Sequence, residues 1–172
     1  MKILITGGAG YIGSHTSTVL HDAGHEIFIY DNLINSNKEV ISQLQKITGA
    51  KFNFKEGDIR DTNLLTKEIK KNRIEAVIHF AGLKAIGESM EKPLDYFDVN
   101  VGGTISLLRA MYANNVNYLV FSSSATVYGQ PNYLPIDEKH LKVTTNTYGQ
   151  TKLQVENILE GVCKRNKSLK KI

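Results

Sequence analysis

The sequence predicts an α/β protein: a doubly wound, Rossmann-type parallel sheet with helices on both of its faces. Short β-branched runs alternate with helical patterns along the whole chain. A glycine-rich segment at residues 7–13 separates the first such run from the first helical pattern. No repeat or low-complexity segment interrupts the alternation. Since right-handed crossovers place helices on the two faces of a sheet, this alternation favours parallel strands.

Five segments have the composition of short strands, each a run of mostly apolar, β-branched or aromatic residues. The first of these runs ends directly at glycines. We expect strands at residues 2–6, 26–30, 51–55, 76–80 and 118–122. The doubly wound order is then 3-2-1-4-5. A sixth strand would follow the last helix, where the sequence stops. We therefore expect the fold to lack its last strands and the fifth strand to be an exposed edge.

Helical patterns fill most of the stretches between these strands. Gly24 stops the first helix, Asn35 or Ser36 caps the second, Asp61 caps the third and Pro93 opens the fourth. Helices are expected over residues 11–23, 37–47, 61–71, 93–114 and 146–164. Residues 128–143 are polar and contain proline, so we expect a loop there.

Composition indicates one ordinary globular domain. The 172 residues are 41% apolar and 22% charged, with a net charge of +4. Five of the last nine residues are Lys or Arg. We therefore expect a domain at 1–163 followed by a basic tail at 164–172. Without the tail the chain is close to neutral, which argues against a nucleic-acid partner.

The single cysteine, Cys163, excludes a disulfide framework and a Cys-based metal site. The five histidines have no metal-ligand spacing, so we expect no metal. Apolar runs are too short to cross a bilayer, and the N-terminus has no signal-peptide pattern. These features predict a cytoplasmic protein that does not bind membranes.

The glycine segment predicts a dinucleotide site. It can be parsed as Gly8-x-Gly10-x-x-Gly13 or, more loosely, as Gly7-x-x-Gly10-x-x-Gly13. In both cases glycines permit a tight turn and close approach of backbone N–H groups to a pyrophosphate. The helix that follows offers its N-terminus to the anion.

Two carboxylates follow the next strands. Asp31 lies 18 residues after Gly13, where it could accept hydrogen bonds from the adenosine ribose and favour NAD over NADP; the alternative is a turn residue. Asp58 could bind the adenine amine or merely cap the next segment, and spacing does not choose between the two.

Small and hydroxylic residues end the fourth and fifth strands. Residues 80–84 could let the backbone lie beside a cofactor, and the hydroxyls at 122–124 could point into the ligand crevice. Either segment could also be an ordinary turn.

Tyr148 and Lys152 share a helix face at i, i+4. A phenol is a poor base near neutral pH. An adjacent ammonium and the positive nicotinamide of NAD⁺ would stabilise the phenolate, which could then take a proton from an alcohol losing hydride. Ser124 could hold the same oxygen. On its own this spacing is common on helix surfaces, so its weight comes from the cofactor segments before it.

Together these segments resemble the extended short-chain dehydrogenase/reductase family, most closely its UDP-glucose 4-epimerase branch. The resemblance covers residues 1 to about 163. It is carried by residues 6–15, 31–33, 56–60, 78–85, 87–89, 121–129 and 148–152. Thr126 is followed by Val127 rather than by an acidic pair, which argues against the 4,6-dehydratase relatives.

The resemblance implies a tightly held NAD and a UDP-glucose or UDP-galactose substrate. Tyr148 would take the proton of the sugar 4-hydroxyl with help from Ser124, and Lys152 would bind the nicotinamide ribose. Cofactor contacts are implied for Gly7, Gly10, Tyr11, Ile12, Gly13, Asp31, Asn32, Leu33, Asn35, Ser36, Asp58, Ile59, Phe80, Ala81, Gly82, Leu83, Lys84, Asn100, Ser122, Tyr148 and Lys152. A homodimer through the helices near 93–114 and 146–164 is also implied.

Two departures from the family pattern matter. Thr147 stands where a proline commonly precedes the tyrosine. The chain is also about half as long as family members, so we expect a truncated protein without the substrate domain and with impaired turnover. A catalytically inactive NAD-binding fragment, or another NAD-dependent nucleotide-sugar dehydratase or reductase, are the alternatives.

Overall fold

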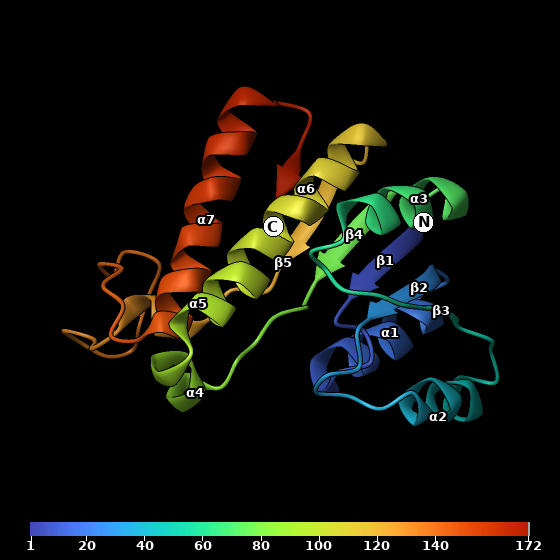
Figure 1. Cartoon of the computed structure of the whole chain (residues 1–172), viewed down its shortest axis with the longest axis horizontal. Helices are drawn as coiled ribbons and strands as arrows, with labels where there is room; N and C mark the ends of the chain where they lie inside the picture. The colour runs from blue at the N-terminus through green and yellow to red at the C-terminus, as the bar shows by residue number, and fades with distance from the viewer. Residues whose placement is uncertain (172) are drawn as a thin grey trace.

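The computed structural model describes residues 1–171, in which six strands form one parallel sheet (Figure 1). The strand order is β3-β2-β1-β4-β5-β6. The strands are β1 (Lys2–Thr6), β2 (Glu26–Asp31), β3 (Asn53–Glu56), β4 (Ala76–His79), β5 (Tyr118–Phe121) and β6 (Lys170–Lys171). The predicted fold class and the predicted order of the first five strands are confirmed.

The short strand β6 corrects one expectation. It pairs in parallel with the start of β5, with Lys170 opposite Tyr118. The backbone N–H of Lys170 donates to the carbonyl of Asn117 at 2.7 Å. The prediction that β5 is an exposed edge is therefore wrong over Tyr118 and Leu119. The expectation that no sixth strand follows the last helix is wrong as well, because β6 comes after that helix. This strand lies in the segment that we expected to be only a basic tail.

Four helices begin and end near their predicted limits: α1 (Tyr11–Asp22), α2 (Glu39–Thr48), α3 (Thr62–Asn72) and α7 (Thr147–Arg165). A fifth, α6 (Gly103–Ala113), ends near its predicted limit but begins later than predicted. Asp61 caps α3 as expected, with its carboxylate accepting from the N–H of Leu64. The expected caps of α2 are wrong. Lys38 occupies the cap position without a side-chain bond, and Ser36 instead donates to Asp31 at 2.9 Å.

The long helix predicted over 93–114 is divided. It consists of α5 (Pro93–Tyr96), a π-helical segment η1 (Phe97–Gly102) and then α6. Two short elements escaped the sequence analysis: α4 (Ile86–Glu91) and the 3₁₀ turn η2 (Ala125–Tyr128). A π-segment widens the helix by one residue per turn, and such segments occur often at functional sites.

Two apolar layers cover the faces of the sheet. Successive residues of a strand point to opposite faces. Ile3 and Ile5 of β1 therefore pack with α2, whereas Leu4 packs with α3, α6 and α7. Val77 in β4 and Leu107 in α6 are fully buried in the second layer. This packing brings the carboxyl ends of β1, β2, β4 and β5 to one edge of the sheet.

Candidate functional site

A cavity of about 280 Å³ lies at the carboxyl ends of these strands. Its walls come from loops that follow β1, β2, β3, β4 and β5 and from the first turns of α7. It is lined by Gly7, Gly10, Tyr11, Ile12, Gly13, Tyr30, Asp31, Asn32, Ile34, Asn35, Ser36, Gly57, Ile59, Phe80, Ala81, Gly82, Leu83, Lys84, Val99, Ser122, Tyr148 and Lys152. This is the crevice in which open α/β sheets bind ligands.

Two glycines of the cavity wall, Gly7 and Gly13, stand where no side chain fits. Gly7 has φ +70°, and a Cβ there would lie 2.6 Å from the backbone N of Ala81. A Cβ on Gly13 would collide with the carbonyl oxygen of Gly7. Gly8 instead packs onto the sheet, where its Cβ would meet Ile29 at 2.8 Å, and it does not line the cavity. The looser spacing Gly7–Gly10–Gly13 thus describes the cavity wall.

Asp31 both organises its loop and lines the cavity. Its carboxylate accepts from the N–H of Ala9 at 3.0 Å, the N–H of Leu33 at 2.9 Å and the hydroxyl of Ser36 at 2.9 Å. Asn35 and Ser36 also lie in the wall, whereas Leu33, with φ +60°, does not. The carboxylate therefore joins the glycine loop to the loop after β2, which forms the adjoining wall.

Asp58 lies outside the cavity wall. Its carboxylate forms a paired contact with Arg60, whose Nε and terminal nitrogen donate at 2.9 and 2.6 Å. This hydrogen bonding to Arg60 lowers the pKa of Asp58. Its neighbours Gly57 and Ile59 do line the cavity. The Asp58 side chain is 32% exposed and its oxygens can accept further hydrogen bonds, so both interpretations that the sequence allowed stay open.

Asn100 supports the wall from behind. Its side-chain oxygen accepts from the N–H of Leu83 at 2.8 Å, and its nitrogen donates to the carbonyl of Leu83 at 2.9 Å and to the hydroxyl of Thr151 at 3.0 Å. Asn100 is buried and is not part of the cavity lining. It holds the loop after β4 against α7.

A buried chain of hydrogen bonds continues from Asn100 to β1. Thr104 donates to the carbonyl of Asn100 at 2.6 Å, so the same hydroxyl must accept from His79 Nε2 at 2.9 Å. His79 Nδ1 then accepts from the hydroxyl of Thr6 at 2.7 Å. Burial lowers the pKa of His79 to about 3. The imidazole is therefore neutral and joins the central strands to the wall of the cavity.

Lys152 lies beside Tyr148 on the cavity side of α7. Its Nζ donates to the carbonyl of Ser122 at 2.9 Å and lies 4.9 Å from the ring centroid of Phe121 and 5.9 Å from that of Tyr148. Only 6% of Lys152 is exposed, and this burial lowers its pKa to about 8. Tyr148 is fixed through its backbone N–H, which donates to the buried hydroxyl of Ser89 at 3.1 Å.

Ser124 does not line the cavity but caps η2 at its edge. Its oxygen accepts from the N–H of Thr126 at 3.3 Å and from the hydroxyl of Thr126 at 2.9 Å. A serine hydroxyl has two acceptor positions and one proton. The proton of Ser124 therefore remains available to donate.

Four lining residues were missing from the sequence-based set: Tyr30, Ile34, Gly57 and Val99. Three of them are sequence neighbours of the predicted Asp31, Asn35 and Asp58. The sequence located these segments correctly but did not show which residue of each segment faces the cavity. Val99 lies in η1, whose π-helical turn the sequence did not predict.

Residues 1–171 contain neither a helix that could span a membrane nor a cluster of side chains that could hold a metal ion. No helix in this range is long and apolar enough to cross a membrane. No group of three or more His, Cys, Asp or Glu side chains in the same range is arranged to hold a metal ion.

Comparison with known proteins gives consistent matches. A profile of the NAD dependent epimerase/dehydratase family matches residues 3–170. The chain is 52% identical over 161 residues to UDP-glucose 4-epimerase of Yersinia enterocolitica, covering 93% of this chain and 48% of that protein. It is 49% identical over 174 residues to the Homo sapiens protein of the same name, covering 97% and 50%. The chain thus spans about half the length of the curated relatives it matches.

Solved structures match over nearly the whole chain. UDP-glucose-4-epimerase from Stenotrophomonas maltophila with bound NAD and formylated UDP-arabinopyranose superposes with a TM-score of 0.97 at 44% identity, covering 99% of this chain and 51% of that one. The Bifidobacterium longum enzyme in complex with NAD⁺ and UDP gives a TM-score of 0.97 at 43% identity, with coverages of 99% and 51%.

Proposed function

Since the chain belongs to the NAD dependent epimerase/dehydratase family, we propose that it provides the NAD-binding and proton-transfer half of a UDP-glucose 4-epimerase. Relatives whose sequences are about 50% identical to this chain carry that name. Two structural neighbours were crystallised with NAD. The cavity supports the same cofactor, because glycines at positions 7, 10 and 13 line it at the start of α1, where backbone N–H groups can approach a pyrophosphate closely.

Different residues of the cavity wall would bind different parts of the cofactor. Gly7, Gly10 and Gly13 would hold the pyrophosphate at the start of α1, and Asp31 the adenosine ribose. Residues 80–84 and Lys152 would hold the nicotinamide ribose end. When bound, NAD supplies a reversible hydride acceptor.

One observation carries the catalytic part of the proposal. The Lys152 ammonium is buried between the carbonyl of Ser122 and the rings of Phe121 and Tyr148, in the cavity that the glycine wall closes. A buried cation stabilises a phenolate nearby. Tyr148 would then accept the proton of the sugar 4-hydroxyl as hydride leaves C4 for NAD⁺, and the Ser124 hydroxyl would donate a hydrogen bond to the same oxygen.

The runner-up is an NAD-binding protein without turnover. The chain covers 48% of the length of the Yersinia enterocolitica relative. A chain without contacts that orient a sugar nucleotide would bind NAD but would not turn a substrate over. Loss of substrate positioning removes roughly 7–11 kcal/mol of catalysis. A different nucleotide-sugar dehydratase or reductase is the third candidate, and analysis of the product would distinguish it.

Turnover of UDP-galactose to UDP-glucose by the purified chain with added NAD⁺ tests the proposal. We expect weak turnover that is lost in Tyr148→Phe, because the phenol oxygen carries the proton. A folded chain that binds NAD⁺ without turnover would favour the runner-up. A folded chain that does not bind NAD⁺ would contradict both.

We further propose a cytoplasmic homodimer. The lone Cys163 is consistent with a reducing compartment.

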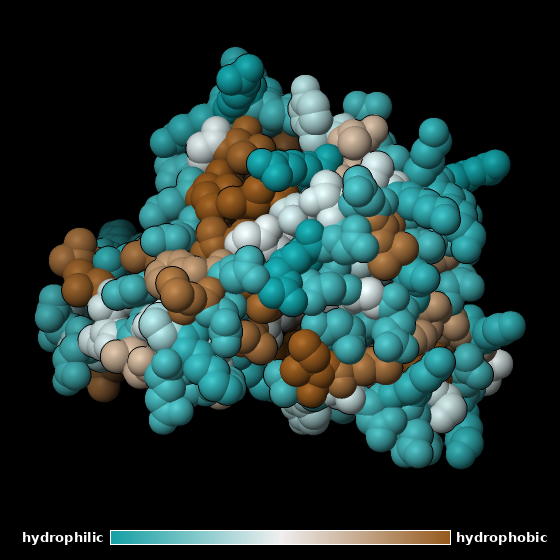
Figure 2. Space-filling view, in the orientation of Figure 1, coloured by the Kyte–Doolittle hydropathy of each residue, from teal (hydrophilic) through white to brown (hydrophobic). Residues whose placement is uncertain are grey.

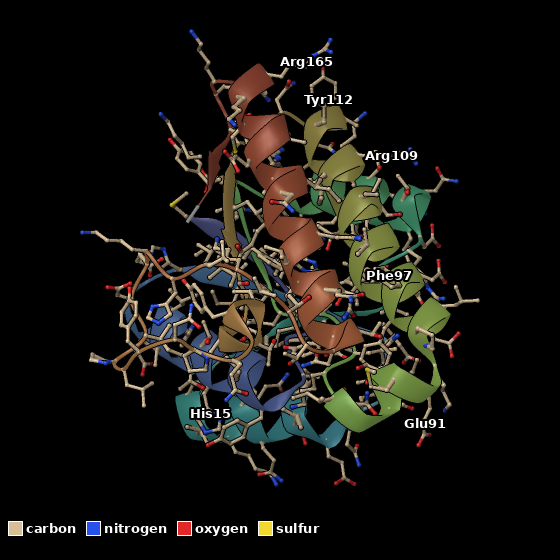
Figure 3. The ribbon with its side chains drawn as sticks, turned by 90° about the vertical axis from the view of Figure 1, so that its left-hand side faces the viewer. His15, Glu91, Phe97, Arg109, Tyr112 and Arg165 are labelled. Atoms are coloured by element: carbon tan, nitrogen blue, oxygen red, sulfur yellow. The ribbon has the colours of Figure 1, made fainter. Side chains whose placement is uncertain are left out.

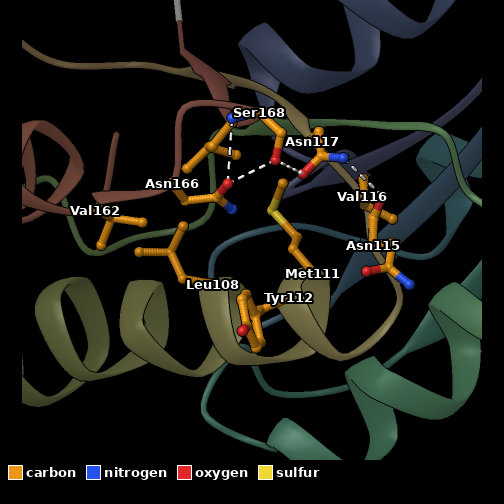
Figure 4. A pocket seen from close by; sticks show the side chains of 10 residues that line it. Leu108, Met111, Tyr112, Asn115, Val116, Asn117, Val162, Asn166 and Ser168 are labelled. Atoms are coloured by element: carbon orange, nitrogen blue, oxygen red, sulfur yellow. Dashed lines mark hydrogen bonds between the residues drawn. The ribbon is translucent and has the colours of Figure 1, made fainter. Parts of the chain in front are cut away.

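Figures 1 and 3 show α6 and α7 side by side, and Figure 2 shows apolar surface gathered between them. A cavity of about 300 Å³ in this region has an apolar floor that includes Leu108, Met111 and Val162 (Figure 4), and Tyr112 at its rim is 77% exposed. Sedimentation velocity tests the dimer, which Tyr112→Lys should weaken.

A further inference from the structure

Glu156 links three separate segments beside the cavity without lining it. It lies on α7, four residues after Lys152 and eight after Tyr148. Its Oε1 accepts from the hydroxyl of Ser123 at 2.5 Å, and its Oε2 contacts Nζ of Lys142 at 2.6 Å. Ser123 belongs to the segment after β5, and Lys142 to the loop that precedes α7. One carboxylate therefore joins the strand end, the loop and the helix.

The bond from Ser123 falls between the two groups that the proposed chemistry uses. Ser122 supplies the carbonyl that holds Lys152 Nζ at 2.9 Å, and Ser124 supplies the free hydroxyl proton. The segment after β5 is thus attached to α7 on two successive turns, at Lys152 and at Glu156. Two attachments one turn apart resist both sliding and rotation of the segment along the helix.

The contact pairs a hydroxyl donor with a carboxylate acceptor, a class of hydrogen bond that is stronger than one between two neutral groups. The Glu156 side chain is 24% exposed, so solvent competes only in part. The hydrogen bond that Lys142 donates to Glu156 also raises the pKa of Lys142.

We propose that Glu156 is a positioning residue, which acts through Ser123 to hold Ser122 and Ser124 in place against Lys152 and Tyr148. This inference rests on the proposed function for its catalytic meaning. Its geometric content, that Glu156 controls the surroundings of Lys152, can be tested without substrate or NAD.

The test follows the titration of Lys152 by NMR in the chain labelled at lysine Cε and Nζ, without cofactor. Its depressed pKa arises from burial, so water entering a loosened segment moves the midpoint upward. We expect Glu156→Leu and Ser123→Ala to raise the midpoint by about one unit, a tenfold change in the protonation equilibrium. Lys152→Met identifies the resonance.

Three further variants locate the effect. Glu156→Gln keeps an oxygen that can accept from Ser123, and Lys142→Met removes only the contact to the loop, so both should titrate close to wild type. Glu160→Gln makes the same chemical change four residues further along α7, where Glu160 pairs with Lys164 at 2.7 Å, and should also match wild type. Urea unfolding of each variant records any general loss of stability.

The outcomes separate positioning from a merely structural role. An unchanged Lys152 midpoint in both Glu156→Leu and Ser123→Ala would overturn the proposal even if their stability fell. A shift in Lys142→Met as large as that in Glu156→Leu would assign the effect to the loop contact and overturn it as well. Because NAD⁺ binding by the wild-type chain is measured separately, failure of the proposed function would be recognised on its own.

Discussion

At the scale of single residues, burial governs the charge of Lys152. Its ammonium has one carbonyl acceptor, from Ser122, and no carboxylate is hydrogen-bonded to it in residues 1–171. Removal from water therefore lowers its pKa from 10.5 to about 8. Near neutral pH the side chain is therefore still mostly charged, and the proposed stabilisation of a phenolate requires that charge.

This depressed pKa makes stability depend on pH. Between about pH 8 and 10.5 the unfolded chain binds the Lys152 proton and the folded chain does not, so folding stability rises with pH in this window. We expect the stability advantage of Lys152→Met over wild type to shrink by roughly 2 kcal/mol from pH 7 to pH 9.5. Urea unfolding of both proteins at the two pH values measures it. A difference that does not change with pH would contradict the burial argument.

Residue types near the cavity were largely predictable because their chemistry is tied to position. Glycines must stand where a Cβ collides, and Asp31 must end the second strand to reach both neighbouring loops. What the sequence could not give was the partner of each polar group. Asp58 accepts hydrogen bonds from Arg60, and Asn100 accepts one from Leu83. Both pairings depend on distances that the fold sets.

At the scale of elements, strand and helix cores were predictable from periodicity, whereas short and irregular elements were not. The six-residue helix α4 has no side-chain cap, and β6 consists of two lysines with no apolar pattern. The π-turn of η1 breaks the 3.6-residue period inside a run that reads as one continuous helix, and the glycines at its end, Gly102 and Gly103, do not identify a π-turn. These elements exist because tertiary contacts stabilise them, as when Ser89 of α4 accepts from Tyr148.

The start of α7 is stabilised locally by Asn146, whose side-chain oxygen accepts from the N–H of Gly149 at 2.7 Å. Asn146→Ala should lower the free energy of unfolding by about 1 kcal/mol, because a helix N–H loses its partner. Asn157→Ala, an exposed position within the same helix, is the control and should not destabilise, since alanine favours helix. Equal losses in the two variants would show that capping is not the cause.

At the scale of the whole molecule, the two apolar layers and the cavity depend on the same strand order. The glycine wall follows β1, and the Phe80–Lys84 segment follows β4, its direct neighbour in the sheet. A ligand that contacts both segments binds only when these strands are paired. Binding and global folding are therefore linked.

We expect NAD⁺ at 100 times its Kd to raise the free energy of unfolding by about 2.7 kcal/mol. For a chain of this size that corresponds to an increase in Tm of roughly 5–10 °C. Differential scanning calorimetry with and without NAD⁺ measures it. Gly7→Ala should show no such increase, because its Cβ would lie against Ala81. A rise in Tm equal to that of wild type in this variant would refute the glycine-wall assignment.

The aromatic lining of the cavity has an optical consequence. The chain has no tryptophan and eight tyrosines, and Tyr11, Tyr30 and Tyr148 all line the cavity. Tyrosine emission overlaps the near-ultraviolet absorption of a reduced nicotinamide but not that of the oxidised form. Intrinsic fluorescence of the unlabelled protein should therefore distinguish the two redox forms of a bound dinucleotide through energy transfer, with no indole signal to obscure it.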